Sequence, residues 1–121
     1  MTTIYGIKNC DTVRKARKWL EAHDVDYVFH DLRNDGLDKK DLSFWVKSVG
    51  WEILLNRRGT TWRQLPDKDK KTINEASATL LMLAQPTLIK RPVLVHHKNV
   101  HVGFKPAEYA MLFKKLRTKN T

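Results

Sequence analysis

Cys10 is the single cysteine among 121 residues, and its chemistry is the most specific that this sequence offers. A thiol attacks as its thiolate, so a catalytic cysteine needs positive potential nearby, which a helix N-terminus can supply. The sequence pattern places Cys10 where a first strand gives way to a first helix, with Arg14 one turn further along the same helix face. The carboxylate of Asp11 would oppose thiolate formation unless it is turned away or caps the helix, so the net activation of the thiol stays open.

The alternative for an isolated cysteine is an inert buried residue, which is the commoner case in soluble proteins. A junction between strand and helix is a poor place for core packing and a good one for binding anions or for chemistry. Val13 stands where the second cysteine of a C-x-x-C redox pair would be, which excludes a dithiol cycle within the chain. An oxidised form of Cys10 would therefore have to be resolved by an outside thiol.

The residues around Cys10 predict the start of an α/β fold. Residues 3–7 are rich in β-branched and aromatic side chains, and Val13, Ala16 and Leu20 then line one face of a helix. A second strand is expected at residues 25–30, ending near Asp31 and followed by the turn-rich residues 33–36. The chain thus begins with a β-α-β unit.

The middle of the chain is predicted to be helical. Asp38 is a good N-cap for a helix, Leu37 can pack on Leu42, and the apolar spacing continues through Trp45, Val46 and Val49. A second helix is expected to begin at Thr72, with Glu75 completing a capping box, and to run to Pro86 with an apolar stripe of Ala76, Leu80, Leu81 and Ala84. Residues 56–59 between these helices read as a loop.

The last third of the chain predicts a hairpin and a final helix. Residues 93–96 and 100–102 read as two strands that turn around Lys98 and Asn99. Pro106 favours a helix start, with a buried stripe of Tyr109, Leu112, Phe113 and Leu116. The order β-α-β, helices, β-β-α is that of a thioredoxin-like fold with a helical insertion, and the length predicts one domain, residues 1–121.

The charge and the cysteine content narrow the possible binding partners and the cellular location. A net charge of +10, from 23 basic and 13 acidic residues, attracts polyanions, but no nucleic-acid motif accompanies it. A solvated basic surface is the simpler interpretation, and we expect neither nucleic acid nor membrane as a partner. One cysteine forms no internal disulfide, and no apolar run is long enough for a membrane span, so we expect a reduced, cytoplasmic location.

Two stretches resemble a known family. Residues 5–12 (YGIKNCDT), followed by a basic helix, and residues 88–94 (LIKRPVL) together resemble the arsenate reductase-like (ArsC) family, in particular its YffB branch. The resemblance extends over almost the whole chain, including the helical insertion and the closing residues 103–106. It implies the thioredoxin-like fold already expected from the order of elements.

The resemblance also implies roles for individual residues. Cys10 would be the nucleophile, Arg91 would hold an anionic substrate or a glutathione carboxylate, and a cis peptide would precede Pro92. Two further arginines complete an oxyanion site in arsenate reductases. One of them falls within residues 56–58, where we favour Arg57 over Arg58, and the other falls at Lys105, which keeps the charge but lacks the planar fork of a guanidinium.

The function that the resemblance implies is that of a glutathione-dependent thiol-disulfide reductase. Its binding pocket would be formed by Arg91, Pro92, Arg57 and Lys105, with Arg14 as a further candidate. No tightly bound cofactor is expected, and glutathione would be the cosubstrate. The other substrate would be a small oxidised or anionic molecule, or a protein mixed disulfide.

Three alternatives remain. Arsenate reduction proper is disfavoured by Lys105. The same family includes Spx regulators, which bind RNA polymerase and usually carry the C-x-x-C pair that Val13 breaks here. The third is a polyanion-binding module in which the cysteine is incidental. A metal site at His96, His97 and His101 is not expected, because adjacent strand residues face opposite ways and no thiolate or carboxylate has ligand spacing.

Overall fold

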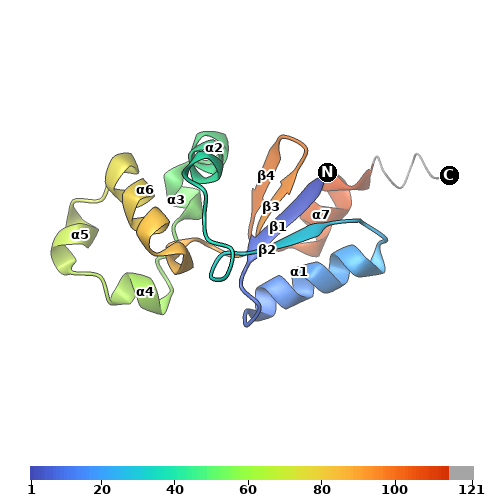
Figure 1. Cartoon of the computed structure of the whole chain (residues 1–121), viewed down its shortest axis with the longest axis horizontal. Helices are drawn as coiled ribbons and strands as arrows, with labels where there is room; N and C mark the ends of the chain where they lie inside the picture. Colours follow the sequence, from blue (N-terminus) through green and yellow to red (C-terminus); the bar gives the residue numbers. More distant parts are fainter. Residues whose placement is uncertain (115–121) are drawn as a thin grey trace.

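The computed structural model describes residues 1–114 and has one four-stranded sheet (Figure 1). Its strands are β1 (Thr2–Gly6), β2 (Val28–Asp31), β3 (Val93–His96) and β4 (Asn99–Val102), in the spatial order β2-β1-β3-β4. β1 pairs with β2 in parallel, while the β1–β3 and β3–β4 pairs are antiparallel. This arrangement confirms the predicted α/β fold and its order of elements.

The helices lie on both sides of the sheet. Two of them, α1 (Asp11–Ala22) and α7 (Pro106–Leu112), lie on one side (Figure 1). The helical insertion lies on the other side and runs from residue 39 to residue 88. It consists of α2 (Lys39–Val49), α3 (Trp51–Leu54), α4 (Thr60–Arg63), α5 (Asp67–Lys71), α6 (Glu75–Ala84) and the 3-10 turn η1 (Pro86–Leu88).

Two apolar cores result from the alternation of side chains along the strands. Ile4 and Leu94 belong to the core that contains α1 and α7, with Leu20 and Tyr109 among its buried residues. Val93, the neighbour of Leu94, belongs to the larger core that contains the insertion. The sheet is therefore covered on both faces, and its ends are the places where loops can present functional groups.

Several local signals act as predicted. The carboxylate of Asp38 accepts a hydrogen bond from the backbone N–H of Lys40 at 2.8 Å and caps α2. Trp45 is buried in the larger core, and Pro106 is the first residue of α7. The predicted α1 stripe of Val13, Ala16 and Leu20 is also buried. Leu116, assigned to the final helix from its spacing, lies outside the described residues.

The predicted start of α6 is wrong, because its N-cap lies two residues after Thr72. Its N-cap is Asn74, whose side chain accepts from the backbone N–H of Ser77 at 2.9 Å, while the Ser77 hydroxyl accepts from the backbone N–H of Asn74 at 3.0 Å. Thr72 instead comes directly after α5, with its hydroxyl donating to the carbonyl of Lys68 at 2.9 Å. Asparagine and serine thus form the reciprocal cap that was expected from Thr72 and Glu75.

The buried face of α6 also differs from the prediction. Ala78 and Met82 are its buried residues. Of the predicted stripe, Leu81 packs against the larger core, while Leu80 is 65% exposed and Ala76 and Ala84 are exposed. The helix is apolar around most of its circumference, so spacing alone does not identify the face that meets the core.

Other corrections concern the ends of elements. β2 starts at Val28, not at Val25, because the backbone N–H of Val25 bonds to the carbonyl of Leu20 at 2.9 Å and closes the end of α1. The hairpin turns at His97 and Lys98, since Asn99 already pairs with His96. β1 runs from Thr2 to Gly6, one residue earlier than predicted, and the short helices α3, α4 and α5 were not predicted.

Candidate functional site

Cys10 lies directly before α1, as its N-cap residue. Its backbone is extended, with φ −120° and ψ 121°, and its carbonyl accepts the first helical hydrogen bond from the N–H of Arg14 at 3.0 Å. Gly6 lets the helix approach the strand, because a Cβ there would lie 2.7 Å from a methyl carbon of Val13. Cys10 packs against the larger core and is a partly exposed residue.

Strand pairing brings two further segments to the end of the sheet near Cys10. Tyr5, near the end of β1, pairs with Val93, the first residue of β3, so Arg91 and Pro92 enter at that end. Val93 also pairs with Val102, the last residue of β4, so the chain towards Lys105 leaves there. The N–H of Gly103 donates to the carbonyl of Pro92 at 2.8 Å and joins the two segments.

Arg91 has one hydrogen bond and one unused buried donor. Its Nη1 donates to the carbonyl of Thr87 at 3.1 Å. Its Nε is buried and has no partner within residues 1–114. Buried donors are nearly always paired in proteins, so an anion bound beside Arg91 would satisfy this atom. The peptide before Pro92 is cis, as the family resemblance implied.

The loop that carries Arg57 is attached to the segment before Arg91. Leu55 and Ile89 form an antiparallel bridge, flanked by N–H to carbonyl bonds from Asn56 to Leu88 at 2.8 Å and from Lys90 to Leu54 at 2.7 Å. The segment just before Arg57 is thus adjacent to the segment just before Arg91, although the two are far apart in sequence.

Two tryptophans flank Arg57. The guanidinium carbon lies 5.9 Å from the ring centroid of Trp51 and 5.6 Å from that of Trp62. Both distances fall within the range of cation–π attraction. The rings restrict the positions that this exposed arginine can take.

A cavity of about 600 Å³ is lined by cations that include two of the four predicted ones. Its lining includes Arg57, Arg58, Lys90 and Lys105, with Glu52 as the single carboxylate. Both arginines of the loop therefore line the cavity. Cys10 and Arg91 are not among the residues that line this cavity. The cavity is adjacent to them through Lys90, which precedes Arg91 in sequence, and through Lys105, whose segment leaves the same end of the sheet.

Lys90 and Glu52 were missed as site residues. Lys90 had a usable signal, because it precedes Arg91 within the stretch that resembles the family. Glu52 had none, because its place in the cavity depends on α3, a helix of four residues that the pattern did not predict.

Arg14 does not join this group. Its guanidinium pairs with the carboxylate of Asp11 on the exposed surface of α1, and neither residue lines the cavity. Asp11 does not cap the helix. The carboxylate of Asp11 therefore forms an ion pair with Arg14, and this pairing offsets the negative charge of Asp11 next to Cys10.

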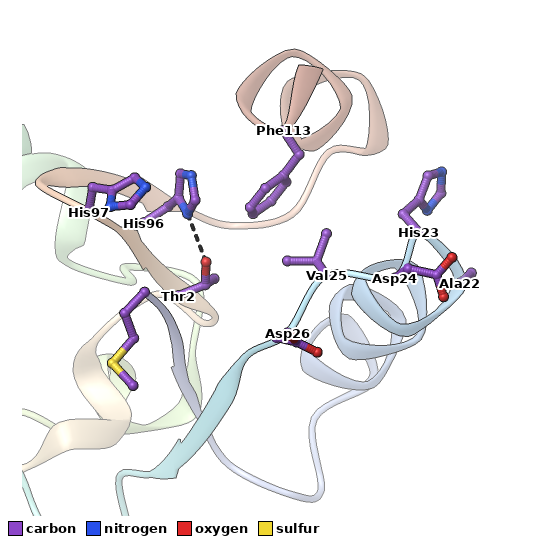
Figure 2. Close-up of a pocket in the computed structure, with 10 residues that line it drawn as sticks. Thr2, Ala22, His23, Asp24, Val25, Asp26, His96, His97 and Phe113 are labelled. Atoms are coloured by element: carbon purple, nitrogen blue, oxygen red, sulfur yellow. Dashed lines mark hydrogen bonds between the residues drawn. The ribbon is translucent and has the colours of Figure 1, made fainter. Parts of the chain in front are cut away.

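A second cavity, of about 560 Å³, lies at the opposite end of the sheet (Figure 2). There Thr2 pairs with His96, and the Thr2 hydroxyl is 2.7 Å from His96 Nδ1. Burial, with smaller effects from His97, the N-terminal amine and His101, lowers the pKa of His96 below its ordinary value of 6.5. This cavity is therefore separate from the end that carries Cys10.

Two further classes of feature are absent from residues 1–114. No group of three or more histidine, cysteine or acidic side chains is placed to hold a metal ion. None of the helices in this part of the chain has the length and apolarity that crossing a bilayer requires.

Comparison with known proteins gives a consistent set of relatives. The model of the ArsC family matches residues 5–112. The solved structure of a YFFB protein is 50% identical, covers 92% of this chain and 97% of its own, and superposes with a TM-score of 0.89. An arsenate reductase (ArsC) related protein from Brucella melitensis is 56% identical, covering 93% and 94% of the two chains with a TM-score of 0.75.

A transcriptional regulator is among the relatives. The global transcriptional regulator Spx 1 of Lactococcus lactis is 31% identical over 111 residues, which is 89% of this chain and 85% of the regulator.

Proposed function

Because this chain belongs to the ArsC family, we propose that it is a thiol reductase in which Cys10 is the nucleophile and glutathione the outside thiol. The observation that supports this most strongly is that the strand pairing places two groups at the same end of the sheet. These are Cys10, a partly exposed residue, and Arg91, whose buried Nε has no partner in the described chain. A carboxylate of glutathione is a suitable partner for that donor.

The reaction requires only thiol–disulfide exchange. The Cys10 thiolate attacks the glutathionyl sulfur of a mixed disulfide RS–SG, a Cys10–SG bond forms, and the RS⁻ group leaves and takes up a proton. A second glutathione thiolate then attacks the same glutathionyl sulfur, releasing oxidised glutathione and restoring the Cys10 thiolate. The sum is RS–SG plus glutathione giving RSH plus oxidised glutathione, so no second cysteine in the chain is needed.

The cationic cavity would hold the charged parts of the substrate. Arg57, Arg58, Lys90 and Lys105 would attract the carboxylates of glutathione, and Glu52 could receive its ammonium group. Pro92 would act through the backbone, since its carbonyl is bonded to Gly103 and links the Arg91 and Lys105 segments. The single cysteine accords with a reducing compartment, and we propose the cytoplasm.

A turnover assay with the variant Cys10→Ser tests the proposal. With a glutathionylated peptide as substrate and glutathione in excess, the wild type should release the peptide thiol. The variant should lose at least about a thousandfold in rate, because a serine hydroxyl stays protonated near neutral pH and cannot form a disulfide. Equal rates for wild type and variant would contradict the proposal, and circular dichroism would show whether the variant is folded.

A regulatory function is the second candidate, supported by the match to the regulator Spx 1. It predicts binding to RNA polymerase without any requirement for turnover. Retention of purified RNA polymerase by the immobilised chain, unaffected by Cys10→Ser, would favour it.

Arsenate reduction is a narrower form of the enzymatic proposal. Lys105 lines the cavity as a point charge and offers no bidentate fork to an oxyanion. Glutathione-dependent reduction of arsenate, measured directly, decides whether this charge suffices.

A further inference from the structure

Two threonine hydroxyls connect α4 and η1, which are the elements next to the segments that carry the arginines of the site. Thr61, in α4, and Thr87, in η1, are 26 residues apart in sequence, and their Oγ1 atoms lie 2.9 Å apart in a partly buried contact. A threonine hydroxyl can donate and accept at once, so the pair makes a hydrogen bond whichever hydroxyl donates.

Thr87 also holds Arg91. Its carbonyl accepts from Arg91 Nη1 at 3.1 Å, and this bond occupies one donor of the guanidinium while Nε has no partner in the described chain. The position of Thr87 therefore influences where the unused Nε points.

Thr61 belongs to the helix that comes after the Arg57–Arg58 loop. Before this loop, the Leu55–Ile89 bridge joins the chain to the segment that precedes Arg91. After it, the Thr61 hydroxyl joins α4 to Thr87. A bond from Arg63 Nη2 to the carbonyl of Arg58, at 2.7 Å, ties the loop to α4 itself. The loop is thus anchored on both sides against the segment that carries Arg91.

We propose that the Thr61–Thr87 hydroxyl pair is a positioning device that holds the Arg57–Arg58 loop and Arg91 at a fixed separation, and so sets the affinity of the anion site. Neither threonine lines the cavity, so each acts through the arginines and not on the ligand. The part of this inference that concerns affinity rests on the proposed function, whereas the part that concerns arginine geometry does not.

The test compares Thr61→Val, which keeps the shape but removes the hydroxyl, with Thr61→Ser, which keeps the hydroxyl. The first readout is the NMR spectrum of the arginine Nε–Hε groups in the ligand-free chain. Thr61→Val should displace the Arg91 signal, and Thr61→Ser should leave it close to its wild-type position. This readout does not depend on the identity of the substrate.

The second readout is the dissociation constant of glutathione beside the rate of Cys10 alkylation by neutral iodoacetamide. Thr61→Val should weaken glutathione binding about fivefold, the effect expected from losing one hydrogen bond, and change the alkylation rate by less than about twofold. Thr61→Ser should restore the affinity. Thr79→Val is the matched control, because the Thr79 hydroxyl bonds within its own helix α6, to the carbonyl of Glu75 at 2.7 Å.

Three results would overturn the inference. They are an unchanged Arg91 signal in Thr61→Val, an equal displacement of that signal in Thr79→Val, and a failure of Thr61→Ser to keep the wild-type signal. If Thr61→Val does not fold, Thr87→Val removes the same hydrogen bond by deleting the other hydroxyl. If the wild type binds no glutathione, the proposed function fails, and the NMR readout still decides the positioning role.

Discussion

Replacing Arg91 by lysine removes the Nε donor while keeping a positive charge. Arg91 Nε is a buried donor without a partner in the described chain, and a lysine ammonium cannot reproduce the guanidinium edge that contains it. A hydrogen bond to a charged group contributes about 1.5 to 3 kcal/mol, which corresponds to about a 10- to 150-fold change in affinity. Because Arg91 is partly exposed and the charge is retained, we expect the low end, about tenfold weaker binding of glutathione.

Isothermal titration of glutathione into the wild type and Arg91→Lys measures this change. Arg17→Lys is the matched control, since Arg17 lies on α1 with its guanidinium carbon 4.2 Å from the ring centroid of Phe29, away from the site. It should bind glutathione with wild-type affinity. Equal affinity in wild type and Arg91→Lys would refute the assignment of Arg91 as the anion donor, and equal losses in both variants would show that the effect is not local.

Two further predictions concern stability. The lowered pKa of His96 means that the unfolded chain binds more protons than the folded one below about pH 6.5, so the free energy of unfolding should fall as pH drops from 6.5 towards the folded-state pKa. Urea titrations from pH 7.5 to 5 should show a weaker pH dependence in His96→Gln than in the wild type, and identical slopes would contradict the assignment. Tyr109→Phe removes a buried hydroxyl that has no partner within residues 1–114, so its melting temperature should equal or exceed that of the wild type. A clear loss of stability in Tyr109→Phe would mean that the hydroxyl is bonded after all.

The predictable part of the fold is the part set by local signals. The strand before Cys10, the helix after it and the caps at Asp38 and Pro106 depend on neighbours within a few residues, and the structure shows them in place. These signals also determined the order of elements, from which the sheet topology could be expected.

The insertion was less predictable because several of its elements depend on tertiary contacts. The helices α3 and α4 have four residues each, too few for a periodic pattern, and α6 is apolar on its exposed and its buried faces. The bridge between Leu55 and Ile89 joins two residues that are 34 positions apart in sequence, and no local pattern predicts it.

The candidate site likewise combines features that follow from local sequence and features that depend on tertiary contacts. The position of Cys10 between a strand and a helix could be predicted from the change of period around it, whereas the roles of Arg91, Arg57 and Lys105 are implied by the family resemblance. The flanking of Arg57 by Trp51 and Trp62 could not be predicted, since it depends on how α3 and α4 are oriented. The pairing of Arg14 with Asp11 is a local (i, i+3) contact. This ion pair could therefore have been predicted from the sequence, although the two residues were considered separately.

The central claim is that Cys10 and the cations near it form one binding site for glutathione. A titration of the isotope-labelled chain with glutathione, monitored by NMR, tests it most directly. We predict that the shifted amide signals are those of Cys10, Arg91, Arg57 and Lys105, while Thr2 and His96 at the other end of the sheet stay unchanged. Shifts confined to Thr2 and His96, or no shifts near Cys10 and Arg91 at saturating glutathione, would contradict the account.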